Sequence, residues 1–305
     1  MTHIAVLGVG RMGAPMAGRL ADAGHELTVW SRTPAHAEAL ADRAMIAGSP
    51  AEAGGKAEVA ITMLADGGAL EEVALGRDGL VDGLPTGSLL MDMSTTGPAS
   101  ARKVAKALEP KGIGFLDAPV VGSIGPAAEG RLAIMVGGDA EAVERVRPLL
   151  GILSDPERTW HVGPVGCGQA AKLMVNLVLG GVMTAVAEGF TLGRVLGLDP
   201  ELALEVLEGA SVAAQTVRGK RDRLLSGDYG NAGFRLALMH KDLRLALDAA
   251  RASRAALPGA ERVADLFAGA KGQGLADQDY SAVAAYLASM APLLEERPEG
   301  RSSKQ

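Results

Sequence analysis

The sequence predicts an α/β fold, with a doubly wound parallel sheet of the Rossmann type and a second, all-helical C-terminal domain. Two observations predict this. Short β-rich apolar runs alternate with amphipathic helical stretches as far as about residue 163, a pattern typical of right-handed βαβ units. Beyond a Gly- and Pro-rich joint, HVGPVGCGQ, the β pattern stops, and long segments rich in Ala, Leu, Arg and Glu follow.

The predicted elements divide the chain into an α/β part and a helical part. Strands are expected at residues 4–7, 26–30, 59–64, 89–93, 114–116 and 132–136. Breaks between helices are expected where Gly, Pro or Asn gather, at 197–200, 227–233 and 257–259. We therefore predict a dinucleotide-binding domain over 1–163, a helical domain over 164–296 and an unstructured polar tail over 297–305.

Composition narrows the class of protein. A chain of 305 residues with 48% hydrophobic and 22% charged residues suits two globular domains. The net charge of −6 and the lack of a basic block argue against a nucleic-acid partner. Cys167 is the single cysteine, so an intrachain disulfide is excluded, and a reducing cytoplasm is expected.

Neither a leader nor a membrane span is expected. The chain begins directly with a strand pattern, without the basic and apolar regions of a signal peptide. The uncharged run 173–187 has 15 residues, short of the ~20 that span a bilayer, so it is expected to be a buried helix.

A glycine-rich turn after the first strand predicts a dinucleotide site. Gly8, Gly10 and Gly13 stand in G-x-G-x-x-G spacing, after a strand and at the start of a helix. Gly8 permits the tight turn, Gly10 lets backbone approach a pyrophosphate, and Gly13 lets helix and strand pack closely. The spacing alone is weak evidence, but the surrounding pattern agrees with it. Arg11 and Met12, in the same turn, are counted with the cofactor contacts.

The end of the second strand indicates which cofactor is preferred. NAD sites usually place a carboxylate here for the ribose hydroxyls, but this chain has Ser31, Arg32 and Thr33. A guanidinium binds a 2′-phosphate through charge-assisted hydrogen bonds, and the hydroxyls add donors. We therefore expect NADP(H), with NAD(H) as the other possibility. The alternative is that Arg32 is a solvated loop residue.

Three polar loops follow predicted strands, where substrates of open α/β sheets bind. They are MLADGG at 63–68, MDMSTTGP at 91–98 and DAPVVGSIGP at 117–126. Their small residues let backbone come close to a nicotinamide ring and a short substrate. The Ser, Thr and Pro of 94–98 also suit a helix N-cap, and one loop can serve both purposes.

The run GQAAKLMVNLVLGG carries Lys172 and Asn176, four residues apart and hence on one helix face. Burial among apolar residues disfavours a charged lysine and lowers its pKa. Such a lysine can give a proton to a carbonyl oxygen and take it back in the reverse direction. Asn176 would hold the same oxygen or orient the ammonium. The alternative is that Lys172 only extends to water.

A second lysine stands in LMHKDLRLALD. Lys241 and Asp242 are adjacent in an apolar helical context, and adjacent helix residues point in different directions, so no mutual salt bridge is implied. Either Lys241 faces a cleft or both residues are surface charges.

Together these motifs resemble the β-hydroxyacid dehydrogenase family, over roughly residues 3 to 295. The resemblance rests on motifs that follow one another in family order, namely GVGRMGAPMAGRL, WSRTP, MLAD, MDMSTTGP, DAPVVGS, EGRLAIMVGG, GQAAKLMVN and KDLRLAL. It implies a Rossmann domain, a helical domain and a long interdomain helix. The segments around 182–199 and 226–248 are most similar to the glyoxylate/succinic semialdehyde reductase branch.

The resemblance also implies roles for single residues. Lys172 corresponds to the catalytic lysine, Asn176 to the asparagine beside it, and Lys241 to the lysine that closes over the cofactor. The remaining implied contacts are, for the cofactor, Met63, Leu64, Ala65 and Thr95 and, for the substrate, Ser94, Thr95, Gly122, Ser123 and Phe234. No metal is implied.

One substrate position departs from the family. The usual pattern is DAPVSGG or DAPVSGS, whereas Val121 replaces the serine here and removes a hydroxyl donor from the carboxylate site. Ser123 or backbone N–H groups would compensate, or else the substrate is less polar.

We expect an NADPH-dependent reductase of small aldehydes or keto acids, such as glyoxylate, succinic semialdehyde or the 3-hydroxyisobutyrate type, forming a homodimer or homotetramer. The alternatives are an imine reductase-like enzyme, which usually replaces the lysine by Asp or Tyr, and a non-catalytic dinucleotide-binding module. A decarboxylating 6-phosphogluconate-type activity would need a longer helical domain.

Overall fold

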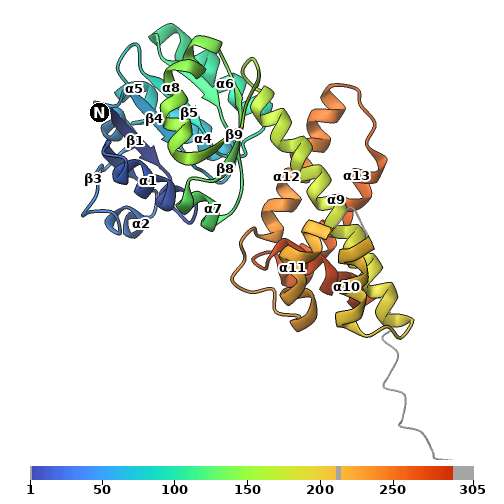
Figure 1. Cartoon of the computed structure of the whole chain (residues 1–305). Coiled ribbons are helices and arrows are strands. Elements are labelled where there is room, and N and C mark those ends of the chain that lie inside the picture. Colours follow the sequence, from blue (N-terminus) through green and yellow to red (C-terminus); the bar gives the residue numbers. More distant parts are fainter. Residues whose placement is uncertain (1, 211–213, 291–305) are drawn as a thin grey trace, which may run out of the picture. The chain divides into compact units, whose positions relative to one another are not determined.

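The computed structural model describes residues 2–210 and 214–290, and these residues form two compact units. The first unit ends at Val175 and the second begins at Asn176. The predicted tail over 297–305 and the last residues of the predicted helical domain lie outside the described residues. Each unit is described by itself below (Figure 1).

The first unit is built on a nine-stranded sheet in the order β3-β2-β1-β4-β5-β6-β8-β7, with β9 paired to β8. The pairs among β1 to β6 are parallel, whereas β8 runs antiparallel to β6 and β7. The bounds are β1 His3–Leu7, β2 Glu26–Trp30, β3 Met45–Ile46, β4 Val59–Thr62, β5 Leu89–Asp92, β6 Gly114–Asp117, β7 Val120–Val121, β8 Leu132–Gly137 and β9 Ser154–Gly163.

The register aligns the carboxyl ends of the parallel strands in one row. Leu7 pairs with Trp30 and with Thr62, Thr62 pairs with Asp92, and Asp92 pairs with Asp117. The polar loops predicted after β4, β5 and β6 therefore leave the sheet along a single edge.

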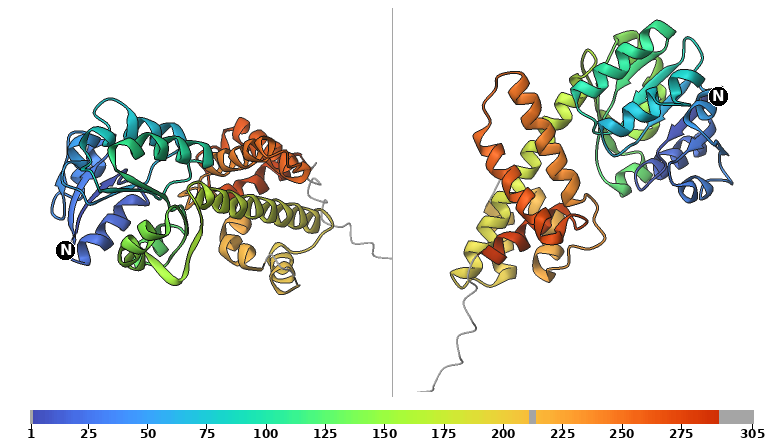
Figure 2. Two further views of the ribbon diagram at one scale, coloured as in Figure 1. Left: turned by 90° about the horizontal axis from the view of Figure 1, so that it is seen from above. Right: turned by 180° about the vertical axis from the view of Figure 1, so that it is seen from behind.

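Helices cover both faces of this sheet, because successive strand residues point to opposite faces and both sets are apolar. Ile4 and Val6 of β1 pack on one side, with α1 (Gly13–Asp22), α7 (Ile124–Glu129) and α8 (Ala140–Leu153). Ala5 and Leu7 pack on the other. That side is covered by α3 (Pro50–Gly54), α4 (Gly67–Leu75), α5 (Leu80–Gly83) and α6 (Pro98–Leu108). Figure 2 shows this unit from two further directions. The short α2 (Pro34–Glu38) follows β2 in the chain.

The predicted fold class is confirmed, but three strands were not predicted. β3 has only two residues, too few to give a pattern. The stretch 117–126 was expected to be a loop, yet Val120 and Val121 form β7, and α7 follows at Ile124. β9 contains Pro156 and several charges, which are common on exposed edge strands and hide their alternation.

The second unit is helical throughout its described residues, apart from one isolated β-bridge. It contains most of α9 (Cys167–Val195), followed by α10 (Pro200–Ala210), α11 (Ala214–Ser226), α12 (Leu236–Ala252), α13 (Pro258–Ala270), a π-helical turn (Lys271–Leu275), a 3₁₀ turn (Tyr280–Ala282) and α14 (Val283–Met290). The predicted break at 227–233 lies within the gap between α11 and α12, whereas those at 197–200 and 257–259 overlap the gaps and extend into the first residues of α10 and α13.

The long helix α9 is buried on one side only. Met183, Ala187 and Phe190 belong to the core of the helical unit, whereas Val178 and Leu192 are exposed. By length and composition alone, Cys167–Arg194 is long and apolar enough to span a membrane. This is weak evidence for a span, because a helix that forms part of a protein core passes the same test.

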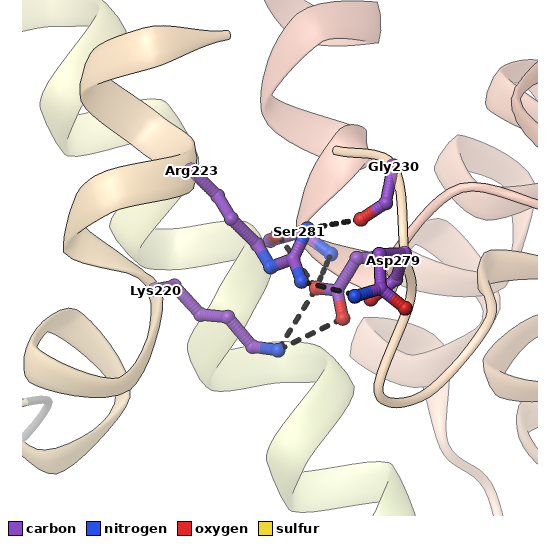
Figure 3. Close-up of polar contacts among 6 residues, drawn as sticks. Lys220, Arg223, Gly230, Asp279 and Ser281 are labelled. Atoms are coloured by element: carbon purple, nitrogen blue, oxygen red, sulfur yellow. Dashed lines mark hydrogen bonds and ion pairs between the residues drawn. The ribbon is translucent and has the colours of Figure 1, made fainter. Parts of the chain in front are cut away.

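A buried ion pair lies in the polar interior of the helical unit (Figure 3). Asp279 is fully buried, and its two carboxylate oxygens lie 2.9 and 3.0 Å from Lys220 Nζ. The hydroxyl of Ser281 donates to Asp279 Oδ1 at 2.7 Å, and Lys220 Nζ also lies 4.6 Å from the centre of the Tyr280 ring. Nearby, the guanidinium of Arg223 donates to the carbonyl of Gly230. The contacts of Lys220 join α11 to the 3₁₀ turn, and that of Arg223 joins α11 to the loop that follows it.

Candidate functional site

The glycine-rich turn after β1 has the geometry that a dinucleotide needs. Gly8 has a φ of +94°, and a Cβ there would overlap the carbonyl of Met63. A Cβ at Gly13 would overlap the carbonyl of Gly8, which explains the close approach of α1 to the turn. Beside Gly10, by contrast, nothing lies within 4 Å of the position a Cβ would take, so its backbone is open to a ligand. The turn therefore fits the pyrophosphate of NAD(P).

The residues predicted around this turn occupy its rim. Arg11 is exposed and Met12 is half-buried immediately before α1. At the carboxyl end of β2, Ser31 is half-buried and both Arg32 and Thr33 are exposed. The guanidinium of Arg32 is thus in reach of solvent at the end of the strand that neighbours β1.

The loops after β4 and β5 are tied to each other. The N–H of Leu64 donates to Ser94 Oγ at 2.8 Å, and Met63 lies against Gly8. Ser94 is only 2% exposed, so its hydroxyl joins the two loops. Ala65 is exposed beside them, and Thr95 is half-buried. The structure thus brings Gly8, Met63, Leu64 and Ser94 together.

Two buried carboxylates, which we had not singled out from the sequence, lie beneath these loops. Asp92 accepts hydrogen bonds from the hydroxyls of Thr62 (2.9 Å) and Thr96 (2.8 Å). Asp117 accepts from the backbone N–H groups of Gly166 and Gln169, both at 2.7 Å. Burial raises the pKa of both carboxyls, despite these donors, and that of Asp117 reaches about 6.

The third predicted loop is more ordered than expected. Val121 ends β7, half-buried and paired with Ala133. Gly122 follows with a φ of +144°, and Ser123 is exposed at the N-cap position of α7, without a capping bond from its side chain. An apolar side chain therefore stands where the family has serine, with an exposed hydroxyl two residues later.

Lys172 lies in the first turns of α9, half-buried and three residues after Gln169. Asn176 stands one turn further along the same helix and is only 2% exposed. In the helical unit the Nδ2 group of Asn176 donates to Asp242 Oδ2.

The expectation for Lys241 and Asp242 needs correction. Asp242 is 2% exposed and is not a surface charge, and its Oδ1 lies 2.8 Å from Lys241 Nζ. The side chains leave α12 in different directions, but the long lysine stem reaches back to the short carboxylate. Asn176 and Lys241 therefore share one carboxylate. Phe234 packs its ring against Tyr280, with centroids 5.8 Å apart.

Both halves of the chain match family models. Residues 3–163 match the NAD binding domain of 6-phosphogluconate dehydrogenase. Residues 166–287 match the NAD-binding domain of NADP-dependent 3-hydroxyisobutyrate dehydrogenase. The chain belongs to the β-hydroxyacid dehydrogenase family. As a member of this family it is an NAD(P)-dependent oxidoreductase.

Individual relatives support the assignment to the β-hydroxyacid dehydrogenase family. Glyoxylate/succinic semialdehyde reductase 2 of Arabidopsis thaliana is 36% identical, over 92% of this chain and 78% of the relative. The NAD-dependent L-serine dehydrogenase of Pseudomonas aeruginosa is 38% identical, over 93% and 97%. Among solved structures, the 3-hydroxyisobutyrate dehydrogenase of Mycobacterium tuberculosis with L-serine superposes with a TM-score of 0.84 at 36% identity, covering 94% of this chain and 99% of that one.

Proposed function

We propose that this protein is an NADPH-dependent reductase of small aldehydes and keto acids that also works in reverse as a β-hydroxyacid dehydrogenase. The observation that carries the proposal is the placement of Lys172. It is half-buried in the first turns of α9, directly after residues that are bonded to the carboxyl edge of the Rossmann sheet. The named relatives, which act on glyoxylate, succinic semialdehyde and serine by their names, support this substrate class.

The residues of the chain divide the work as follows. The nicotinamide, when bound, supplies or receives the hydride. Lys172 gives a proton to the carbonyl oxygen of the substrate in reduction and removes it in oxidation. Thr95, Asn176 and the 122–123 backbone position the substrate, and Lys241 closes over the cofactor.

The preference for NADP(H) rests on Arg32. Its exposed guanidinium follows β2, where a carboxylate would repel a 2′-phosphate. One relative is named as NAD-dependent and one matching family model as NADP-dependent, so the cofactor preference of this chain is measured directly. We expect Arg32→Glu to lower kcat/KM for NADPH at least tenfold relative to NADH, a change of ~1.4 kcal/mol. Arg77→Glu, at another exposed arginine, should leave the ratio unchanged. Equal discrimination in both variants would reject the assignment.

The proton role is tested by Lys172→Ala. A positioned general acid contributes ~10² to 10⁴-fold, so kcat should fall by that factor while NADPH binding by fluorescence titration persists. Lys106→Ala, at an exposed position of α6, is the matched control. The substrates to measure are glyoxylate, succinic semialdehyde, methylmalonate semialdehyde and tartronate semialdehyde. Full turnover by the Lys172 variant would reject the role.

Val121 determines how polar the preferred substrate is. If the substrate carries a carboxylate, Val121→Ser should lower its KM by about tenfold, because a hydrogen bond to a charged group contributes ~1.5 kcal/mol. An uncharged aldehyde should show no such gain. Unchanged KM values for every carboxylate substrate would mean either that Ser123 and backbone N–H groups already bind the carboxylate or that the substrate is less polar.

Two other functions are weighed against this one. An imine reductase-like enzyme usually lacks the lysine, and a non-catalytic dinucleotide-binding module would have no need of it. NADPH consumption with aldehydes but not with cyclic imines supports the reductase, and no consumption with any substrate would favour the module.

We also propose a homo-oligomer that pairs through α9 and α10. Val178 and Leu192 on α9 and Leu202 and Val206 on α10 are each more than half exposed. An apolar surface of this kind is typical of an interface. Light scattering should give a dimer or tetramer for the native chain and a smaller species for Leu192→Glu.

A further inference from the structure

Gln169, one turn before Lys172, is fully buried, and its side-chain amide is used entirely on the loop after β5. Its Oε1 accepts from the backbone N–H groups of Thr96 (2.9 Å) and Gly97 (3.0 Å). Its Nε2 donates to the Ser94 carbonyl at 2.9 Å and lies 3.5 Å from Asp92 Oδ2. An amide offers two donors and one acceptor oxygen, so both of its ends are committed to residues 92–97.

The backbone of Gln169 is fixed as firmly as its side chain. The carboxylate of Asp117, at the end of β6, accepts from the N–H groups of Gly166 and Gln169 and so caps the start of α9 from another element. The neighbouring Gly168 packs directly against the strands, because a Cβ there would overlap the carbonyls of Asp117 and Met135. These contacts fix the position of the first turn of α9 relative to the sheet.

These contacts fix the position of Lys172 relative to the loop 94–97. Lys172 follows Gln169 by three residues, about 4.5 Å along the helix axis. The same loop carries Ser94, which binds Leu64, and Thr95, a proposed substrate contact. A displacement of about 1 Å between reacting groups can cost ~10²-fold in rate.

We propose that Gln169 is a positioning residue, which holds the proton-donating Lys172 in register with the substrate-binding loop 94–97. This inference rests on the proposed function. Gln169 touches neither substrate nor cofactor in this role; it acts through the backbone of Ser94, Thr96 and Gly97.

The test compares Gln169→Met, which keeps the length of the side chain but removes its hydrogen bonds, with Gln215→Met at an exposed position of α11. For the Gln169 variant, kcat with NADPH should fall roughly 10- to 100-fold, while the NADPH Kd stays within about twofold. The kinetic isotope effect on kcat with NADPH deuterated at the transferred position should increase, because hydride transfer becomes slower than product release. Wild-type kcat and isotope effect in the Gln169 variant would overturn the proposal.

A readout independent of activity separates this inference from the proposed function. Hydrogen exchange by mass spectrometry should show faster exchange at Thr96 and Gly97 in Gln169→Met, and no change in Gln215→Met. If the wild type reduces no substrate, the proposed function fails, and unchanged exchange at these two amides would separately overturn the positioning role. Should Gln169→Met fold poorly, Gln169→Asn keeps a buried amide that is one methylene too short, and the same outcomes apply to it.

Discussion

The buried acidic side chains of the two units differ in their hydrogen-bonding partners. In the Rossmann unit, Asp92 and Asp117 receive hydrogen bonds from hydroxyls and backbone N–H groups, and burial raises the pKa of both. In the helical unit, burial alone would raise the pKa of Asp279, but the hydrogen bonds from Lys220 and Ser281 hold it below its usual value.

The difference shows what each arrangement is suited to. Neutral donors on the backbone are directional, so the acids of the Rossmann unit fix loops and the start of a helix beside the proposed site. A lysine partner neutralises charge and joins two elements, as Lys220 does between α11 and the 3₁₀ turn. The following predictions test this contrast, from the largest expected effect to the smallest.

Removing the cation of the helical unit should have the largest effect. Lys220→Met leaves Asp279 fully buried without its ion-pair partner and should lower the free energy of unfolding by about 3–5 kcal/mol. Urea unfolding followed by circular dichroism measures this loss. Lys271→Met, at an exposed position of the same unit, is the control. Equal losses in both variants would show that the ion pair does not contribute specifically to the free energy of unfolding.

The stabilising contribution of Asp117 should depend on pH in the opposite direction to that of Asp279. The pKa of Asp117 rises from 3.8 to about 6 on folding, so the folded state holds its proton more tightly. Its stabilising contribution is complete below about pH 4 and is lost as the pH rises through about 6, by up to ~3 kcal/mol. The stability of the wild type relative to Asp117→Asn should therefore fall over this range.

The control for this titration is Gln215→Asn, which changes no titratable group at an exposed position of α11. Its stability relative to the wild type should stay constant over the same range. Asp279, with a lowered pKa, contributes above 3.8 and loses its contribution only as the pH falls through and below that value. A wild-type advantage over Asp117→Asn that grows with rising pH would contradict the assignment.

The hydroxyl that supports Asp279 should contribute less than its lysine. Ser281→Ala removes one hydrogen bond to a carboxylate that keeps Lys220, so we expect a loss of about 1.5 kcal/mol in urea unfolding. Ser289→Ala, at an exposed hydroxyl, should change little. A loss as large as that of Lys220→Met would mean that the hydroxyl, and not the cation, dominates.

An exposed ion pair should have the smallest effect. Arg147 and Glu144 form a pair on the surface of α8, where solvent screens the charges. Arg147→Ala should leave the urea midpoint within experimental error. A clear shift would show that pairing stabilises without burial, and would weaken the contrast between the units.

The sequence was sufficient for the fold class and for the edge of the sheet that carries the proposed site. Apolar runs located β1, β2, β4, β5, β6 and β8, because both faces of these strands are covered. It was not sufficient for β9, whose exposed edge tolerates Pro156 and charges. Nor was it sufficient for β7, where Val120 and Val121 lie between turn-forming residues.

The candidate site was predictable where a motif is local, as at Gly8 to Gly13. Asp92, Asp117 and Gln169 stand within the motifs, but the sequence does not show their roles, because Asp117 and Gln169 have partners 49 to 77 residues away and Asp92 meets Thr62 30 residues away. Likewise, the sequence around Asp242 does not indicate that Asn176, 66 residues away, binds the same carboxylate as Lys241. A polar residue inside an apolar run was the available signal, and only the folded structure shows which partner it meets.

The distribution of tryptophan and tyrosine gives each unit its own intrinsic fluorescence signal. Both tryptophans, Trp30 at the end of β2 and Trp160 in β9, belong to the Rossmann unit, whereas the three tyrosines, Tyr229, Tyr280 and Tyr286, belong to the helical one. Fluorescence excited at the red edge, where tyrosine does not absorb, thus reports on the Rossmann unit alone. Tyrosine emission reports on the other. Without any added label, a single titration of the native chain can reveal whether the two units unfold together or one after the other.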